Sequence, residues 1–283
     1  MKSVVITGVS TGIGHDAARY LLAHEYRVWG SVRRQADADR LQAAFGPHFT
    51  PLLFDVTDEA AIKTAADQVA AQLDGRGLTG LVNNAGIAVS GPLMHVPLDK
   101  FRQQLEINLV GALAVTQAFL PLLGAQQNPG YPPGRIINIS SVSGSIVYPF
   151  FGPYASSKHG LEVISHAFRR ELRPYGIDVI IIAPGSVRTP IWDKAEAEEL
   201  GQYADTDYAP ILLKLQERLV RLGKAGIPVE VVSRTIHQAL AVPRPKARYV
   251  LARNFWIGWL LPRWLPSRWF DKIVAQRMGI DPE

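Results

Sequence analysis

The chain has 283 residues, of which 47% are hydrophobic and 19% are charged, and its formal net charge is +5. This composition excludes an intrinsically disordered chain and supplies enough apolar side chains for one large α/β domain or two small ones. The absence of cysteine excludes disulfides, thiolate metal sites and cysteine nucleophiles, and we expect no metal site. The basic residues form no stripe or motif typical of nucleic-acid binding, so we expect no nucleic-acid partner.

The N-terminal residues Met1-Lys2-Ser3 lead directly into an apolar β-branched run. A secretory signal peptide would need a longer apolar stretch and a cleavage site of small residues, so we expect a cytoplasmic protein. Basic residues gather toward the C-terminus, which leaves open either a solvated basic tail or contact with an anionic membrane surface. These residues are Arg244, Lys246, Arg248, Arg253, Arg263, Arg268, Lys272 and Arg277.

Over the first 190 residues, short β-branched runs alternate with longer amphipathic segments. Continuous apolar strands separated by helices are typical of a parallel sheet covered on both faces, so we expect a doubly wound α/β fold of the Rossmann type. We predict strands at 4–7, 27–32, 50–55, 80–83, 134–139 and 178–183. We predict helices at about 13–24, 59–73, 98–122 and 154–175.

The rest of the chain departs from this alternation. Residues 126–134 are rich in proline and glycine and are expected to form a loop. Residues 190–226 are helical by composition, followed by a helix at 229–241 and a last strand at 247–251. Because no repeat or linker interrupts the sequence, we expect a single domain over residues 1–283, with a substrate lid at 190–226 and a Trp-rich extension at 252–283.

A glycine-rich run follows the first predicted strand and opens the first predicted helix. Glycine lets the backbone turn sharply and approach a pyrophosphate closely, while a helix N-terminus supplies free N–H groups and a positive dipole end. The pattern T-G-x-x-x-G-I-G resembles the cofactor loop of the short-chain dehydrogenase/reductase family. The residues expected to contact a dinucleotide here are Thr7, Gly8, Ser10, Thr11, Gly12, Ile13 and Gly14.

The residues that close the second strand decide which dinucleotide fits. An acidic residue there would bind the adenosine ribose 2′-hydroxyl and repel a 2′-phosphate. This chain instead has Arg33 and Arg34, whose guanidinium groups can pair with a 2′-phosphate, although both could also be merely solvated. We therefore expect NADP(H) in preference to NAD(H). Thr11 departs from those relatives that carry a second basic residue near the loop.

The family resemblance implies further cofactor contacts after the later strands. It implies that Asp55 and Val56 hold the adenine, and that the run N-N-A-G buttresses the cofactor and the sheet. The run at 184–189 is similar to the family's P-G-x-x-x-T, whose backbone and threonine engage the nicotinamide carboxamide; a simple Pro-Gly turn is the alternative. The residues concerned are Asn84, Ala85, Gly86, Pro184, Gly185, Val187 and Thr189.

Tyr154 and Lys158 are four residues apart, so on a helix their side chains share one face. A tyrosine ordinarily loses its proton near pH ~10, and a neighbouring ammonium group favours the phenolate. The spacing Y-x-x-x-K is common by chance and is usually structural. Its meaning therefore depends on the residues around it.

Two further polar residues match the family's Asn-Ser-Tyr-Lys tetrad in order and spacing. Ser141 closes the fifth strand, at the edge of the sheet where ligands of doubly wound folds bind. Asn108 lies within an apolar helix, where a buried amide needs partners. The resemblance implies that Tyr154 is the general acid and base, and that Ser141 hydrogen-bonds the substrate oxygen. It also implies that Lys158 lowers the pKa of the tyrosine and binds the nicotinamide ribose, with Asn108 holding a water as a proton relay.

Apolar side chains follow both Ser141 and the last cofactor motif, and they favour a bulky, lipophilic alcohol or ketone as substrate. The run Tyr-Pro-Phe at 148–150 is similar to the hydroxysteroid and retinol dehydrogenase branch of the family. The loop residues are Ile146, Val147, Tyr148, Phe150 and Phe151. The lid residues are Pro190, Ile191, Trp192, Tyr203, Tyr208, Leu212 and Leu213.

Four of the six tryptophans, Trp256, Trp259, Trp264 and Trp269, lie in the C-terminal extension. This segment could pack on its own domain, form a lid or dimer contact, or lie in a membrane interface, where tryptophan and arginine are favoured. A non-catalytic dinucleotide-binding regulator and an acyl-thioester ketoreductase remain as alternative functions. By analogy with the family, we expect a homodimer or homotetramer formed through the helices that carry Asn108 and Tyr154.

Overall fold

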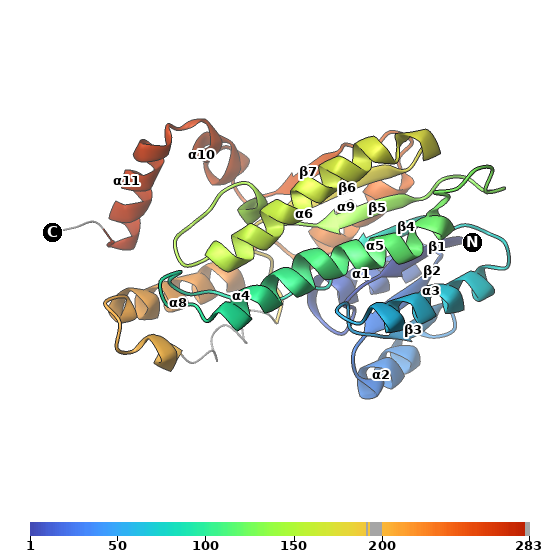
Figure 1. Ribbon diagram of the computed structural model, residues 1–283, viewed down its shortest axis with the longest axis horizontal. Helices are drawn as coiled ribbons and strands as arrows, with labels where there is room; N and C mark the ends of the chain where they lie inside the picture. Colours follow the sequence, from blue (N-terminus) through green and yellow to red (C-terminus); the bar gives the residue numbers. More distant parts are fainter. Residues whose placement is uncertain (191, 193–199, 281–283) are drawn as a thin grey trace.

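The computed structural model describes residues 1–190, 192 and 200–280. Its centre is a parallel sheet of seven strands in the order β3-β2-β1-β4-β5-β6-β7, which confirms the predicted doubly wound fold (Figure 1). The strands are β1 (Lys2–Ile6), β2 (Tyr26–Val32), β3 (Phe49–Leu53), β4 (Gly80–Asn83), β5 (Arg135–Ile139), β6 (Asp178–Pro184) and β7 (Arg248–Leu251). The predicted last strand is therefore present and forms an edge of the sheet.

Successive side chains of the central strands point to opposite faces of the sheet, and each face has its own core. Val4 and Ile6 pack with α1 (Gly12–Leu22), α2 (Gln35–Phe45) and α9 (Val229–Ala241). Val5, between them, packs on the other face. That face is covered by α3 (Glu59–Leu73), α5 (Gly111–Phe119) and α6 (Gly152–Glu171). The helices thus cover both faces, as the continuous apolar strands predict.

The strand order reverses direction between β1 and β4, which are neighbours in the sheet. The chain winds from β1 to β2 and β3 on one side, and from β4 through β7 on the other. The chain after β1 therefore enters α1 on one face of the sheet, whereas the chain after β4 leads to α5 on the other face. A crevice at this switch point is where doubly wound folds bind ligands.

Several boundaries differ from the sequence prediction. Helix α2 was not predicted, because only Ala38 and Leu41 of it are buried and its apolar periodicity is weak. The predicted helix at 98–122 is α4 (Leu98–Leu105), a π-helical turn at Glu106–Val110, α5 and a 3-10 turn at Leu120–Leu123. The helix expected from residue 154 begins earlier, at Gly152.

The C-terminal part adds helices at one end of the sheet. Helix α8 (Ala209–Lys224) confirms the helical character expected within 190–226, although Ile191 of the predicted lid lies outside the described residues. After β7 the chain forms a π-helical turn at Trp256–Leu260, α10 (Leu261–Trp264) and α11 (Ser267–Met278). In Figure 1 these last helices project beyond the sheet, with α11 on the side of α8.

Candidate active site

The glycine-rich run forms a tight turn between β1 and α1. Gly8 and Gly12 have φ angles of 71° and 66°, which side chains rarely adopt. A Cβ atom on Gly14 would lie 2.3 Å from the carbonyl oxygen of Gly8, so only glycine allows this packing. Thr11 precedes the first turn of α1 and makes no side-chain capping bond. The N–H groups of that turn are thus available to an anion.

The N-N-A-G run after β4 is hydrogen-bonded to this turn. The Thr7 hydroxyl oxygen accepts from the backbone N–H groups of Asn84 and Ala85, each at 3.0 Å. The Asn84 amide donates to the carbonyl oxygens of Thr7 and Gly8, at 2.9 and 3.0 Å. Asn84 therefore helps to fix the shape of the loop.

A cluster of arginines lies beside the loop. Arg33 and Arg34 have mostly exposed side chains and approach Asp55 and Asp37, at 3.7 and 2.9 Å. Arg40, which the sequence analysis missed, donates to the carbonyl oxygen of Ser10 and to Asp37, each at 3.0 Å. Hydrogen bonds from Arg40 and Arg34 hold the pKa of the Asp37 carboxyl below its usual range. The signal for Arg40 was weak because its helix was not predicted.

Asp55 and Val56, the two residues expected to hold the adenine, have different surroundings. The Asp55 carboxylate accepts from the backbone N–H and the hydroxyl of Thr57, at 3.1 and 3.0 Å, and so closes a local turn. Val56 is buried, and its carbonyl oxygen would lie 2.7 Å from a Cβ atom on Gly111 of α5. Both residues are thus held in place before any ligand binds.

Ser141 and Tyr154 meet at the carboxyl end of β5. Ser141 caps a 3-10 turn at Val142–Gly144, and its hydroxyl accepts from the Ser143 N–H at 3.1 Å. Burial raises the pKa of Tyr154, and a hydrogen bond with the Ser141 side chain lowers it. The net shift of the pKa is upward. Desolvation of the phenolate outweighs the favourable contacts.

Lys158 lies one turn after Tyr154 on α6 and is buried. Its Nζ donates to the carbonyl oxygen of Ile139 on β5 at 2.8 Å, and lies 5.8 Å from the centre of the Tyr154 ring. Burial lowers the pKa of Lys158 to about 8, although the Glu162 carboxylate raises it. The ammonium group is therefore held close to the tyrosine by a backbone bond.

Asn108 lies in the π-helical turn between α4 and α5 and is buried. Its amide accepts from the N–H of Ile87 at 2.8 Å and donates to the Ile87 carbonyl oxygen at 2.9 Å. It also donates to the Ser157 hydroxyl at 3.2 Å, which in turn donates to the Tyr154 carbonyl oxygen at 2.7 Å. Asn108 thus connects the loop after β4 to the turn of α6 that carries Tyr154 and Ser157.

Gln104, which the sequence analysis did not select, strengthens the same connection. Its side chain is fully buried and accepts from the Val89 N–H at 2.6 Å while donating to the Ile87 carbonyl oxygen at 3.0 Å. The signal available in the sequence was its position one helical turn before Asn108.

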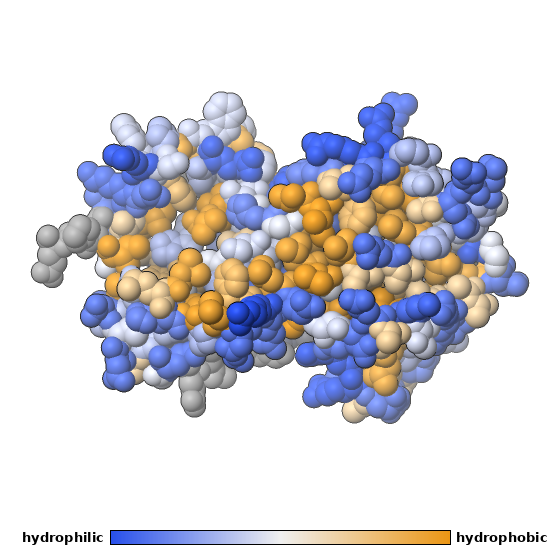
Figure 2. All heavy atoms as spheres, viewed as in Figure 1, coloured by the Kyte–Doolittle hydropathy of each residue, from blue (hydrophilic) through white to orange (hydrophobic). Residues whose placement is uncertain are grey.

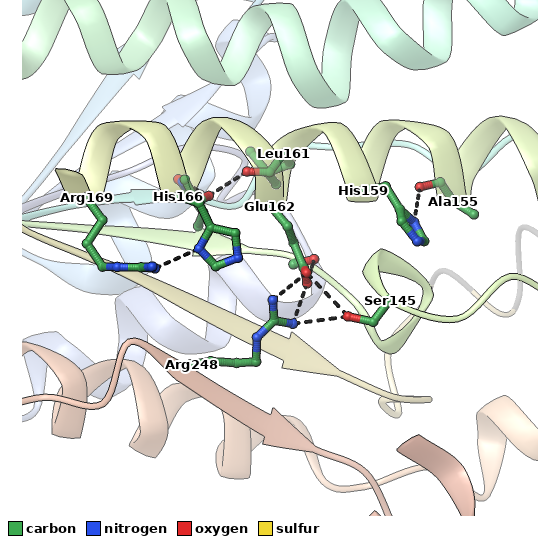
Figure 3. A network of polar contacts seen from close by, with 11 residues as sticks. Ser145, Ala155, His159, Leu161, Glu162, His166, Arg169 and Arg248 are labelled. Atoms are coloured by element: carbon green, nitrogen blue, oxygen red, sulfur yellow. Dashed lines mark hydrogen bonds and ion pairs between the residues drawn. The ribbon is translucent and has the colours of Figure 1, made fainter. Parts of the chain in front are cut away.

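A buried ion pair lies one further turn along α6 from Lys158 (Figure 3). Glu162 receives two hydrogen bonds from Arg248 of β7, at 2.9 and 2.5 Å, and one from the Ser140 hydroxyl at 2.8 Å. The Ser145 hydroxyl donates to the same carboxylate at 3.3 Å. This network ties the turn that contains Ser141 to α6 and to the edge strand. No local pattern predicts it, because Glu162 and Arg248 are 86 positions apart.

The run at 184–189 faces the glycine-rich loop from β6. Gly185 donates through its N–H to the Leu251 carbonyl oxygen at 3.1 Å, and Val187 pairs with Ile227. A Cβ atom on Gly12 would lie 3.8 Å from Thr189 Cβ, which is an ordinary van der Waals distance. Thr189 therefore lies next to the start of α1.

The structure brings part of the predicted substrate region together just before Tyr154. Phe150, Tyr203 and Leu212 form a buried apolar cluster, and the Phe150 ring lies 5.5 Å from that of Tyr208. Phe150 has a φ of 70°, a strained value for a residue with a side chain. Leu213, expected in the lid, is instead mostly exposed. Among the described residues, no group of three or more His, Asp or Glu side chains could hold a metal.

The chain is similar in sequence and in fold to known dehydrogenases and reductases. A family model described as short chain dehydrogenase matches residues 2–200. The chain is 40% identical over 273 residues, 96% of both chains, to the NADPH-dependent 3-dehydrocapnine reductase of Ornithobacterium rhinotracheale. It is 33% identical to retinol dehydrogenase 5 of Homo sapiens, over 96% of this chain and 87% of that one. A solved short-chain dehydrogenase from Streptomyces avermitilis is similar with a TM-score of 0.75 at 26% identity, covering 98% of this chain and 95% of that one.

Proposed function

We propose that this chain, which belongs to the hydroxysteroid and retinol dehydrogenase-like branch of the short-chain dehydrogenase/reductase family, transfers hydride between NADP(H) and a bulky apolar alcohol or ketone. Membership of the family makes it an oxidoreductase that acts on CH–OH groups. In this proposal Tyr154 is the general acid and base. The observation that carries it is the placement of Tyr154 and Lys158 on one face of α6 beside Ser141 at the carboxyl end of β5, where the Lys158 Nζ donates to the Ile139 carbonyl oxygen at 2.8 Å and lies 5.8 Å from the centre of the Tyr154 ring.

The carboxyl edge of the sheet at the switch point carries backbone features that suit a dinucleotide. Its glycine turn has the close backbone packing that only glycine allows, and the first turn of α1 has no side-chain cap. Thr7, Gly8, Ser10, Thr11, Gly12, Ile13 and Gly14 would hold the pyrophosphate, and Asn84, Ala85 and Gly86 would support that loop. Asp55 and Val56 would contact the adenine; Pro184, Gly185, Val187 and Thr189 would contact the nicotinamide. When bound, NADP(H) supplies or accepts the hydride.

The arginine cluster supports NADP(H) in preference to NAD(H). Arg33, Arg34 and Arg40 bring three guanidinium groups to the end of β2, against the carboxylates of Asp37 and Asp55. The exposed Arg33 and Arg34 side chains are free to turn toward a 2′-phosphate, which forms strong bidentate bonds with guanidinium. The NADPH-dependent relative at 40% identity supports the same choice.

In the direction of reduction, Tyr154 gives its hydroxyl proton to the substrate oxygen, and Ser141 donates a hydrogen bond that steadies the developing charge. The raised pKa of Tyr154 keeps the phenol protonated at neutral pH, as an acid requires. Lys158 then stabilises the phenolate that remains and would bind the nicotinamide ribose. Asn108, through Ser157 and the loop after β4, positions this helix face and would hold the relay water that returns the proton.

The substrate class is proposed from the apolar cluster of Phe150, Tyr203 and Leu212, which lies next to the start of α6. Relatives named as a 3-dehydrocapnine reductase and a retinol dehydrogenase support a substrate that carries an alcohol or carbonyl group. We propose that residues 190–226 and the remaining loop residues cover the substrate. A bulky lipophilic ketone is the natural probe.

We also propose a cytoplasmic homodimer or homotetramer. Figure 2 shows hydrophobic side chains over the face formed by α4, α5 and α6. Val110 and Val163 are exposed there. The helical stretch Leu98–Leu123 is long and apolar enough to cross a membrane by length and composition, but Asn108 and Gln104 join it to the catalytic domain. Its apolar face therefore fits a subunit contact.

The test is nicotinamide absorbance with NADPH and with NADH, against a panel of bulky ketones, steroids and retinal, using Tyr154→Phe as the control. We expect turnover with NADPH that Tyr154→Phe abolishes while cofactor binding persists. Equal turnover in the variant would contradict the role of Tyr154. Tight NADPH binding without turnover on any ketone would favour the non-catalytic regulator, and turnover only on acyl thioesters would favour the ketoreductase.

A further inference from the structure

The last described part of the chain exposes aromatic side chains that folded proteins usually bury. We call residues 252–280 the C-terminal hairpin; it lies beyond the region matched by the family model. Trp256, Trp264 and Trp269 are 70%, 80% and 69% exposed, whereas Trp29 in the sheet is fully buried. The hairpin therefore does not use these rings to pack on its own domain.

The charges of the hairpin complement an anionic surface. In the sequence, residues 252–283 carry five basic side chains and three acidic ones, Asp271, Asp281 and Glu283. Among the residues that the structure describes, none of the five is in an ion pair with a carboxylate, and Arg263 instead lies over the Trp259 ring at 5.0 Å. Tryptophan favours the boundary of a bilayer, and arginine pairs with lipid phosphates. The basic side chains are Arg253, Arg263, Arg268, Lys272 and Arg277.

Helix α11 has a second face that borders the substrate region. The Phe270 ring lies 6.1 Å from that of Tyr148 in the loop after β5. Met278 and Ile280 pack against the cluster of Phe150, Tyr203 and Leu212. Arg218 of α8 donates to the Arg277 carbonyl oxygen at 3.2 Å. Figure 2 shows hydrophobic side chains gathered between these C-terminal helices and α8.

The two faces follow from helical spacing. Phe270, Val274 and Met278 recur every four residues and point inward, while Trp269 and Lys272 are exposed. One short helix thus joins the apolar cluster near Tyr154 to an exposed surface rich in tryptophan and arginine.

We propose that the C-terminal hairpin docks on an anionic lipid bilayer and that α11 there delivers a membrane-dissolved alcohol or ketone to the cluster of Phe150, Tyr203 and Leu212. The delivery step rests on the proposed function; the docking does not. The bilayer is the occupant because the exposed rings alternate with unpaired cations along the hairpin. A second copy of the chain would bring the same basic side chains and would offer them few carboxylates, whereas lipid phosphates offer each of them an anion.

Docking is tested by co-sedimentation of the full chain with vesicles of phosphatidylcholine alone or mixed with phosphatidylglycerol. The variant is Trp256→Ser/Trp264→Ser/Trp269→Ser, and the matched control is Leu53→Ser/Tyr175→Ser, which removes exposed apolar side chains elsewhere. We expect binding to the anionic vesicles only, about ten-fold weaker for the tryptophan variant and unchanged for the control. Failure of the unmodified protein to bind, or equal binding by the tryptophan variant, would overturn the docking.

Two further measurements separate the outcomes. Turnover of a small soluble ketone should be unchanged in the tryptophan variant, whereas turnover of a long-chain ketone dissolved in the vesicles should fall at least five-fold. Equal turnover of the vesicle-borne ketone would overturn the delivery step. Absence of turnover on the soluble ketone in the unmodified protein would count against the proposed function and leave docking standing. A lower oligomeric state of the variant in light scattering would make the hairpin a subunit contact and overturn the proposal.

Discussion

Around the part of α6 that carries Tyr154 and Lys158, charged and polar side chains are buried and paired, whereas the C-terminal hairpin exposes its largest apolar side chains. Lys158 bonds to Ile139, Glu162 bonds to Arg248, and Asn108 bonds to Ile87. In the hairpin, Trp264 is 80% exposed. Interactions in the first region hold the side chains around Tyr154 in one geometry. The second region leaves its apolar surface available to something outside the chain. Comparable changes in the two regions should therefore have very different effects.

The largest effect is expected at the buried ion pair. Glu162→Gln leaves Arg248 without its carboxylate in a site where the two side chains are only 7% and 22% exposed. Losing one partner of a buried pair leaves the other charge uncompensated, so the free energy of unfolding should fall by about 3–5 kcal/mol. Urea denaturation measures this. The matched change is Arg34→Gln, at a pair in which Arg34 is 79% exposed and Asp37 keeps Arg40 as a second partner. It should cost no more than about 1 kcal/mol, and equal losses would contradict the comparison.

The next effect concerns the cofactor. Arg33→Ser/Arg34→Ser removes two guanidinium groups from the end of β2, and charge-assisted hydrogen bonds contribute about 1.5–3 kcal/mol. The preference for NADPH over NADH, measured as the ratio of kcat/KM values, should therefore fall about 10- to 100-fold. Arg173→Ser, an exposed arginine far along the chain, is the control. An unchanged ratio in the double variant would assign the 2′-phosphate to another group.

A smaller effect is expected from pH. The pKa of Lys158 is lowered to about 8 in the folded state by burial, while the unfolded chain keeps the ordinary lysine value. Between the two pKa values the unfolded state binds more protons, so stability should rise with pH. From pH 7.5 to 9.5, the free energy of unfolding should increase by about 1–2 kcal/mol more for the unmodified chain than for Lys158→Met. Parallel pH profiles would show that this lysine is not desolvated.

The smallest effect should come from the hairpin itself. Trp264→Ala removes an exposed ring, so the free energy of unfolding should change by no more than about 0.5 kcal/mol. Trp29→Ala removes a fully buried ring and should cost about 3–5 kcal/mol. Thermal or urea unfolding of both variants measures the two losses, and because both changes are Trp→Ala they differ only in the burial of the ring. A large loss for Trp264→Ala would show that the hairpin is packed.

The same contrast explains how much the sequence could predict. The strands were predicted because they are continuous apolar runs, and Ser141, Tyr154 and Lys158 were selected because their spacing along the chain carries the signal. The bond between Glu162 and Arg248 could not be predicted, since it joins residues brought together only by the whole fold. Arg40 was missed because α2 buries only Ala38 and Leu41, and so shows little periodicity.

The direction of the Tyr154 pKa shift also depended on the fold. The sequence shows the neighbouring lysine but not the burial, and burial determines the sign. The π-helical turn at Asn108 is likewise invisible in the sequence, because a π turn has no composition of its own. For the hairpin, the sequence showed the tryptophans and the basic residues, and only the structure shows that three of the rings are exposed.

The most direct test of the central claim is isotope transfer from NADPH that carries deuterium at nicotinamide C4. A bulky lipophilic ketone is incubated with the protein, and the product alcohol is analysed by mass spectrometry. We predict one deuterium on the carbinol carbon when the label is on the transferred face, and no product with Tyr154→Phe. Alcohol without deuterium from either labelled face, or tight NADPH binding with no alcohol from any ketone of the panel, would contradict hydride transfer at this site.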